Sequence, residues 1–470
     1  MVRLRNDAAE AMGEGLDRIR EECDVPSGFP IEVMQAADEA AARPIGADHV
    51  DRTDRHFATL DPATSTDLDQ AFAIEAPATP GGDIVLHYAI ADVGWFVQPG
   101  DALDTEAFRR GVTIYLPDRR ATLYPQILSE GAASLLPDVE RPAVVFTVRV
   151  DESGQSRLDG VERARVRSRA KLAYDKVGSD DLPDGFVELF RRFRLAEDRR
   201  GAPRVEFPEQ EVGRNRHGDY ELTFRPRLDS EEQNAALSLS TNLAVADALY
   251  AAGTGLFRVM AEVDERGIRR LRSSARAFGL DWPKHQSLAD FEQSLPRSDP
   301  RTSAFLLAVR RAGGGASYAP YAPGVRPWHA AVAATYAQAT APLRRLQDRY
   351  VIEATLAVAN GRAVPDEVQA AFERLPKAMA RADQRAGRAE KMALELAEAV
   401  VLSGHVGQVF EATVLDEGNG RDAGTVEIQI VDPPVIARVG ARRVDPGDVI
   451  QVRVTAVDVD ARHVTLERIA

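Results

Sequence analysis

The order of strand-like and helical runs restricts the fold of this chain more than any other feature. From about residue 51 to 175, short strand-like runs such as HFATL, IVLHYAIADVGWFV and AVVFTVRV are separated by turn residues. Helical patterns follow, at residues 233–280, 330–360 and 366–402. We expect Pro376 to break the last of these helices. Strands followed by helices are typical of an α+β domain, which we place at residues 51–402.

Two further domains are expected on either side of the α+β domain. Residues 6–22 and 31–42 have helical patterns, and the turn-forming segment VPSGFP separates them, which predicts a small helical unit at residues 1–50. Two short helices can form a helix-turn-helix, but more often they pack against a larger domain. From residue 403 to 470 the chain returns to five short strand-like runs, which predict a small OB-type barrel, a common carrier of single-stranded nucleic acid.

Composition excludes several classes of protein. The chain has 470 residues, contains no apolar run of eighteen or more, and lacks the apolar stretch of a secretory signal near its amino terminus. These features predict a soluble cytoplasmic protein without a membrane partner, and we expect a monomer. Because Cys23 is the only cysteine, an internal disulfide and a zinc site made of thiolates are excluded. The eight histidines show no metal-binding spacing.

The overall charge argues against a nucleic-acid partner, but the local pattern does not. A formal net charge of −14 would repel a polyanion, whereas binding depends on the local field in a groove. In the segment VERARVRSRAKLAYDK, basic residues recur at the period of a strand and would point to one side, namely Arg163, Arg165, Arg167, Arg169 and Lys171. On this segment alone, a solvated strand face is the preferred interpretation.

Three aspartates, Asp61, Asp67 and Asp69, lie within nine residues of the segment HFATLDPATSTDLDQAF. Asp61 ends one strand-like run, PATST forms a turn, and Asp67 and Asp69 share one face of the next expected strand. Converging carboxylates repel one another unless a hard cation lies among them, and Mg²⁺ prefers such oxygen ligands. On these residues alone, a turn capped by Asp61 and Asp67, with Asp69 in solvent, is the more frequent arrangement.

These segments are similar to the signatures of the RNase II/RNase R exoribonucleases, a family with an RNB catalytic domain. LDPATSTDLDQAF resembles the family's acidic signature, LHYAIADVGWFVQPGDALDTEAFRRGVTIYLPDR resembles the next signature, and RARVRSRAKLAYDKV resembles its arginine strand. YAQATAPLRRLQDRYV resembles the family's late motif. The resemblance covers about residues 51–400 in the family's order, and the final barrel is similar to the ribosomal-protein-type OB domain that usually follows RNB.

The resemblance implies magnesium-dependent hydrolysis of single-stranded RNA from its 3′ end, with release of nucleoside 5′-monophosphates. Two divalent ions, with Mn²⁺ as a substitute for Mg²⁺, would activate a water and neutralise charge on the leaving oxygen. Asp61, Asp67 and Asp69 would anchor these ions. Gln70 stands where the family has a fourth acid, and it can offer only a weaker neutral oxygen ligand or orient a ligating water.

The resemblance also implies contacts with RNA. Arg344 would bind the phosphate near the cut and is grouped with the catalytic acids, because a guanidinium fork fits phosphate oxygens. The expected RNA-binding residues are an aromatic clamp, a glutamate near the 3′ end and two arginines, namely Tyr115, Phe207, Glu390, Arg345 and Arg167. Outside these motifs, such an aromatic is usually core, and such a charged residue on a helix is usually solvated.

The sequence departs from the family pattern in further places. Ala341 stands where the late motif usually has Ser, and the helical unit at residues 1–50 stands in place of the family's cold-shock domains. The expected barrel offers Phe410 and almost no other aromatic, and its seven arginines against eleven acids give a net charge of −4, so we expect it to guide RNA weakly.

Two other functions remain open at this stage. A non-catalytic RNA-binding protein on an RNB scaffold is the first alternative, because Gln70 impairs the expected metal site. A DNA-binding regulator that uses residues 1–50 is a less favoured alternative, because nothing in that segment marks a recognition helix.

Overall fold

The structure is a computed structural model that describes residues 2–3, 6–79, 81–202, 209–214, 220–225, 227–296, 300–417, 424–445 and 447–469. Its centre is a six-stranded sheet in the order β2-β9-β3-β4-β5-β8. The strands are β2 (Val50–Asp51), β3 (Phe57–Asp61), β4 (Gln70–Glu75), β5 (Ile84–Ala91), β8 (Glu140–Val150) and β9 (Ser156–Ala173). β9 pairs with β8 through residues 156–167 and with β3 through residues 168–173, so the sheet curls back on itself.

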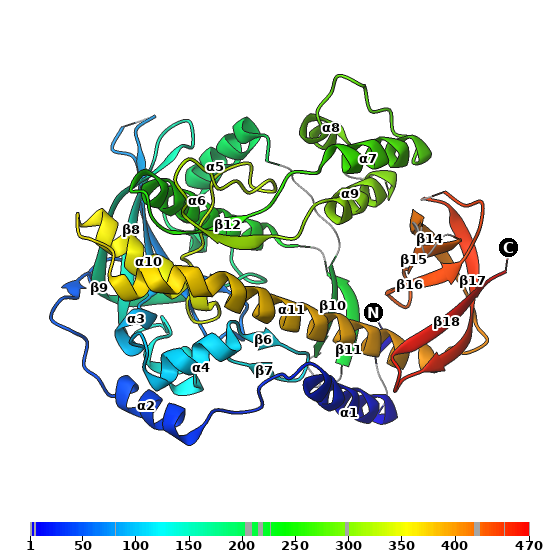
Figure 1. The fold of residues 1–470 in the computed structure, drawn as a ribbon, viewed down its shortest axis with the longest axis horizontal. Coiled ribbons are helices and arrows are strands. Elements are labelled where there is room, and N and C mark those ends of the chain that lie inside the picture. Colours follow the sequence, from blue (N-terminus) through cyan, green and yellow to red (C-terminus); the bar gives the residue numbers. More distant parts are fainter. Residues whose placement is uncertain are drawn as a thin grey trace.

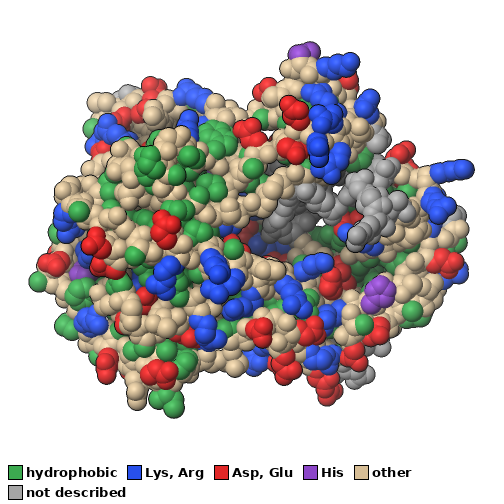
Figure 2. Space-filling model, viewed as in Figure 1, with side chains coloured by type: hydrophobic (Ala, Val, Ile, Leu, Met, Phe, Trp, Pro, Cys, Tyr) green, Lys and Arg blue, Asp and Glu red, His purple; other side chains and the backbone are tan. Residues whose placement is uncertain are grey.

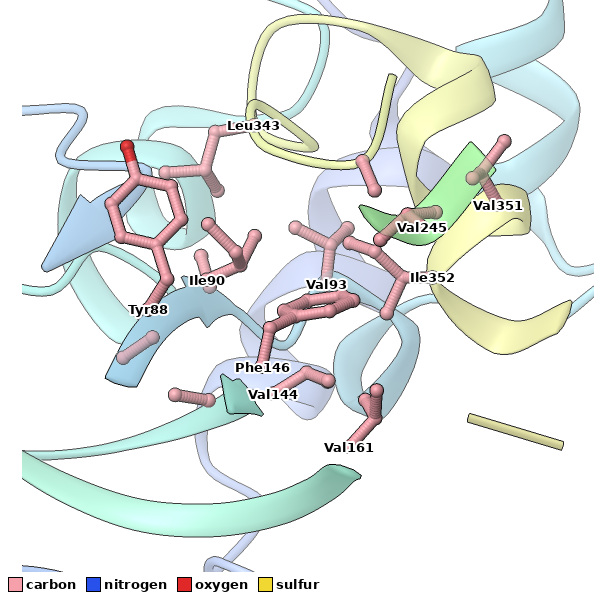
Figure 3. Close-up of a cluster of buried hydrophobic side chains, with 14 of the residues drawn as sticks. Tyr88, Ile90, Val93, Val144, Phe146, Val161, Val245, Leu343, Val351 and Ile352 are labelled. Atoms are coloured by element: carbon pink, nitrogen blue, oxygen red, sulfur yellow. The ribbon is translucent and has the colours of Figure 1, made fainter. Parts of the chain in front are cut away.

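Helices cover this sheet and bury its apolar face (Figure 1). They are α2 (Ile31–Ala41), α3 (Val93–Phe96), α4 (Ala102–Arg110), α5 (Phe186–Arg200), α6 (Asp229–Ala251), α10 (Leu346–Ala359) and the long α11 (Asp366–Ser403). In Figure 3, Phe146 from the sheet lies beside Val245 of α6 and Ile352 of α10, whereas Tyr88 lies on the other side of Ile90. Burial of apolar side chains between sheet and helices is the main stabilising contribution to such a domain, and the expected α+β fold is confirmed.

The carboxyl-terminal part is a closed five-stranded barrel in the order β14-β15-β16-β18-β17, as expected for an OB-like domain. Its strands are β14 (Val409–Glu417), β15 (Thr425–Ile430), β16 (Val435–Gly440), β17 (Val449–Asp458) and β18 (His463–Arg468). Inward and outward side chains alternate along β15 and along most of β17, which is the pattern that a barrel with an apolar interior requires.

A small helical lobe projects beside the barrel (Figure 1). It consists of α7 (Glu265–Ala277), α8 (Leu288–Ser294) and α9 (Pro300–Ala312), and it has its own core in which Trp282 stacks on Phe291. The remaining strands form small sheets, namely β1 (Val2–Arg3) with β10 (Glu209–Arg214) and β11 (Tyr220–Arg225), β6 (Ile114–Tyr115) with β7 (Arg120–Ala121), and β12 (Leu256–Val259) with β13 (Ser317–Pro320).

The two expected amino-terminal helices exist, and they pack into different cores. α1 (Asn6–Glu22) lies against α11, where a Cβ at Gly15 would collide with Leu396, and its apolar side chains share a core with the barrel. α2 packs instead into the core beside the central six-stranded sheet. Cys23 is buried in the α1 core, with Sγ 3.5 Å from Sδ of Met392. The division at residue 50 stays a prediction.

Three expectations about secondary structure were wrong. Residues 330–345 are irregular, and α10 begins only at Leu346. The expected helical stretch at 233–280 is interrupted by β12. Pro376 lies inside α11 without ending it. An interior proline costs about 3 kcal/mol, and α11 offsets this cost by burying Phe372, Leu375 and Met379 around the proline.

None of the helices in the described part of the chain is long and apolar enough to cross a lipid bilayer.

Candidate active site

The acidic cluster lies where β3 ends and β4 begins. Asp61 is the last residue of β3, whereas Asp67 and Asp69 lie in the connecting loop, because β4 begins only at Gln70. The expectation that Asp67 and Asp69 belong to a strand was therefore wrong. The loop is fixed by Lys171 of β9, whose Nζ donates to the carbonyl oxygens of Ala63 and Ser65 at 2.9 and 2.6 Å, so a basic residue of the arginine strand shapes the site.

Asp69 is the most buried acid of the cluster. Its Oδ1 accepts a hydrogen bond of 2.7 Å from the backbone N–H of Leu343, and its Oδ2 lies 3.3 Å from Nε of Arg344. Burial raises the pKa of Asp69 to about 7, although Arg344 and the Leu343 N–H act in the opposite direction. The structure thus brings together Asp69 and Arg344, which lie 275 residues apart in the sequence.

Two side chains of the hairpin formed by β6 and β7, Arg120 and Tyr115, hold Asp67. These two residues face each other across β6 and β7, and both contact Asp67. Arg120 donates to Oδ1 at 2.6 Å, and the Tyr115 hydroxyl donates to Oδ2 at 3.1 Å. Burial and the charge of Asp67 raise the pKa of Tyr115, so its hydroxyl stays protonated and remains a donor. The Tyr115 side chain is nevertheless half exposed.

Asp61 differs from the other two acids because no described residue donates a hydrogen bond to its carboxylate. The pKa of Asp61 is raised to about 6, mainly by burial; the nearby Arg344 opposes this shift, and the charge of Asp67 adds to it. A divalent cation would stabilise the charged form of such a carboxylate. Asp61, together with Asp69, therefore fits a magnesium ion, which is usually held by one or two carboxylates and substrate phosphates.

The arrangement of the three acids is looser than expected. Within the described residues, no three His, Cys, Asp or Glu side chains are grouped closely enough to bind one metal ion. The physical reason is visible in the contacts: Arg120 holds Asp67, whereas Leu343 and Arg344 hold Asp69. Protein donors thus already neutralise part of the charge that was expected to draw in cations.

Gln70 points its carbonyl oxygen at two hydroxyl groups. Oε1 accepts hydrogen bonds from Tyr88 and, at 3.0 Å, from Ser238. Any metal ion at Gln70 would compete with these hydrogen bonds. The ligand role of Gln70 stays a prediction, and its structural role is to tie β4 to α6.

The segment that carries Arg344 is irregular and rigidly anchored. Arg345 forms a bidentate ion pair with the fully buried Asp348, with distances of 2.9 and 2.6 Å. Asp348 also accepts a hydrogen bond of 2.7 Å from the backbone N–H of Ala341. From α6, Asn242 accepts from the N–H of Ala339 at 2.9 Å. These contacts leave Arg345 engaged with protein and direct Arg344, which is 44% exposed, toward the acids.

The other expected RNA contacts are spread over the molecule. Arg167 does lie on the outward face of β9 with its basic neighbours, as the alternation predicted, but its guanidinium pairs with Glu140 at 2.6 Å. Glu390 is exposed on α11. Phe207 lies outside the described residues. The structure therefore brings Asp61, Asp67, Asp69, Gln70, Arg344 and Tyr115 to one site, and the RNA-binding roles of the others stay predictions.

Sequence reasoning missed Arg120, Asp348 and Asn242. Arg120 had a detectable signal, because the turn-forming Pro-Asp pair after Tyr115 predicts a hairpin that would place the two side chains opposite each other. Asp348 and Asn242 gave no comparable signal, since their partners lie on a loop that was taken for helix.

Comparison with known proteins decides the family. A model described as the RNB domain matches residues 49–360, about two thirds of the chain. The chain belongs to the RNB family. A second model, the RNase II-type exonuclease C-terminal S1 domain, matches residues 408–469, which is the barrel. The expected resemblance to RNase II and RNase R, and the assignment to their class of 3′→5′ exoribonucleases, are confirmed at the level of the family.

Individual relatives agree with this assignment. Ribonuclease R of Aquifex aeolicus is 26% identical over 97% of this chain and 70% of its own length. Solved structures of Mycoplasma genitalium RNase R, one in the apo form and one with ribose methylated single-stranded RNA, match with a TM-score of 0.86 at 18% identity, over 98% of this chain and 78% of theirs.

One relative carries a contrasting name. The Arabidopsis thaliana protein called inactive exonuclease DIS3L2 is 39% identical over 27% of this chain and 12% of its own length. Membership of the family therefore does not by itself show that a chain is catalytically active, because activity depends on the site residues of that chain.

Proposed function

We propose that this RNB-family protein is a magnesium-dependent 3′→5′ exoribonuclease that degrades single-stranded RNA to nucleoside 5′-monophosphates, as a cytoplasmic monomer. One observation carries the proposal. Asp61 and Asp69, a guanidinium and an exposed tyrosine come from separate segments of the chain and meet at one site. Carboxylates for a hard cation, a cation for a phosphate and a ring for a base are the groups that this reaction requires.

The side chains of the site have separable tasks. The Leu343 N–H fixes the orientation of the Asp69 carboxylate, and Arg344 can exchange Asp69 for a phosphate oxygen of RNA, because its Nε is 3.3 Å away and its side chain is half exposed. The Tyr115 ring can stack on a base beside the cut. When bound, a divalent ion would supply an activated water and neutralise the leaving oxygen. Asp61 and Asp69 would hold such an ion.

A route for RNA is consistent with the surface. Figure 2 shows a hollow between the lobe of α7–α9, the long helix α11 and the barrel. α9 contacts β14, and α11 contacts β17 and β18, so these parts surround the hollow. α7 contributes exposed basic side chains to the lobe, namely Arg266, Arg269, Arg270 and Arg276. Local positive charge of this kind can attract a polyanion to an acidic protein.

A non-catalytic RNA-binding protein is the second candidate. It is favoured by the hydrogen bonds that occupy Gln70 and by the guanidinium that occupies Asp67, since both reduce the oxygen ligands left for metal ions.

Incubation of the purified protein with labelled single-stranded RNA, the matching DNA and duplex RNA, with and without Mg²⁺, distinguishes the two candidates. Magnesium-dependent release of mononucleotides from the single-stranded RNA supports the exoribonuclease. Retention of intact RNA in a stable complex supports the binding protein.

Tyr115→Ala should change the length of the final product more than the rate of cleavage. Loss of one base stack costs about 1–3 kcal/mol, so short RNAs should dissociate earlier and longer end products should accumulate. Tyr115→Phe is the matched control, because it keeps the ring and removes only the hydroxyl that contacts Asp67. Product ladders on a denaturing gel provide the measurement, and equal ladders for Tyr115→Ala and wild type would show that the ring does not stack on RNA.

Gln70→Asp should lower the magnesium concentration that gives half-maximal cleavage, because a charged ligand would replace a neutral one. Tyr88 and Ser238 would lose their shared acceptor, but their hydroxyls are 3.0 Å apart and can pair with each other. Magnesium titrations of the cleavage rate for both proteins test this expectation. An unchanged half-maximal concentration would assign Gln70 a purely structural role.

A further inference from the structure

Arg120 is held in a closed network that contains two acids. One of its terminal nitrogens donates to Asp67 at 2.6 Å, and the other lies 2.7 Å from the Thr66 hydroxyl and 3.0 Å from a carboxylate oxygen of Glu130. The Thr66 hydroxyl in turn donates to Glu130 at 2.9 Å. The guanidinium thus bridges Asp67 and Glu130, and both acids are largely buried, at 11% and 19% side-chain exposure.

In this network both carboxylate oxygens of Asp67 already accept a hydrogen bond. Oδ1 faces Arg120, and Oδ2 accepts the Tyr115 hydroxyl. An arginine remains charged at every pH at which proteins are folded, so the positive charge beside Asp67 is permanent. A divalent ion at Asp67 would have to share an oxygen with one of these donors or displace it, and it would be repelled by the guanidinium as long as it stayed nearby.

The opposite side of the site is arranged differently. No described residue donates a hydrogen bond to the Asp61 carboxylate, and Asp69 faces an arginine whose side chain is 44% exposed and can turn to a phosphate. Arg120 has no comparable freedom, because it is 25% exposed and bound to Thr66 and Glu130 as well as Asp67. Asp61, and Asp69 once Arg344 turns away, therefore offer oxygen ligands to an ion more readily than Asp67 does.

We propose that Arg120 is a built-in counter-cation of Asp67, so that the site binds one divalent ion, at Asp61 and Asp69, in place of two. This inference rests on the proposed function, because it concerns the same site. Arg120, in place of a second metal ion, would neutralise the charge of Asp67. The expected number of ions falls from two to one, and the remaining ion is still held by carboxylate oxygens.

The test counts bound ions directly. Mn²⁺ is titrated into the full chain without RNA, and free Mn²⁺ is measured by electron paramagnetic resonance. The ions of the site are those lost when Asp61 and Asp67 are both replaced by Asn. We expect one such ion in wild type and two in Arg120→Gln, where the guanidinium is gone. Arg119→Gln is the matched control on the same turn, because Arg119 pairs with Asp17 and is 63% exposed, and it should retain one ion.

Three results would overturn the proposal. These are two site ions in wild type, no site ion in wild type, or a single ion in a folded Arg120→Gln. If Arg120→Gln does not fold, Arg120→Ala combined with Glu130→Gln removes the cation together with one of its acids, and two ions are again expected. RNA cleavage is measured separately: one bound ion with no cleavage by wild type would refute the proposed function and support the counter-cation.

Discussion

Asp69→Asn should fold normally, bind single-stranded RNA about as well as wild type and lose nearly all hydrolysis. Asparagine can still accept the hydrogen bond of the Leu343 N–H, so the loop should keep its shape. The negative charge that orients Arg344 and would hold a divalent ion is lost, and we expect cleavage to fall by roughly two to three orders of magnitude. RNA binding should persist, because loss of an anion beside phosphates reduces repulsion.

A filter-binding titration and a cleavage assay on the same RNA provide the two measurements. Asp54→Asn is the matched control, since Asp54 is exposed in the turn before β3 and the same charge is removed away from the loop. Near-wild-type cleavage by Asp69→Asn would refute its catalytic role. Loss of binding or of folding would instead identify Asp69 as a structural acid.

Asp348→Ala should destabilise the catalytic domain severely. Asp348 is fully buried and is the partner of Arg345 and of the Ala341 N–H, so its removal leaves a partly buried guanidinium and a buried backbone donor unpaired. Breaking a buried pair by deleting one partner typically costs about 3–5 kcal/mol. Urea unfolding followed by tryptophan fluorescence should show a transition at clearly lower urea than in wild type.

The double variant Arg345→Met with Asp348→Leu tests whether the loss of stability in Asp348→Ala comes from the unpaired charge of Arg345 or from the change at position 348 itself. It removes both charges and should recover much of the lost stability, because an apolar pair of similar size avoids unpaired buried charge. If Asp348→Ala unfolds at the same urea concentration as wild type, the pair does not anchor the segment that carries Arg344.

The fold class could be predicted from local patterns, whereas the acidic site was predicted from the resemblance of its motif to the family, because its local pattern alone favoured a capped turn. The alternation of apolar and basic residues along β9 is visible in the sequence, since strand periodicity is a short-range property. The grouping of Asp61, Asp67 and Asp69 follows from their closeness in the chain. Which residue pairs with each charged side chain could not be predicted, because the partners of Asp67 and Arg345 depend on tertiary contacts.

The errors in secondary structure have a similar origin. Residues 330–345 contain many alanines and were taken for helix, but side chains of α6 and α10 capture the backbone of this segment in an irregular form. Pro376 is tolerated because the neighbouring turns of α11 are buried, and burial cannot be read from a single helix. Tertiary packing thus overrides local preference at both places.

The packing of α1 has a consequence for how the protein folds during synthesis. α1 contacts α11 and the barrel, and Cys23 meets Met392 across 369 residues of sequence. At about 5–20 residues per second, translation of the intervening chain takes roughly 20–80 s. During this time α1 lacks its partners in α11 and the barrel, so the core that they share can form only near the end of translation.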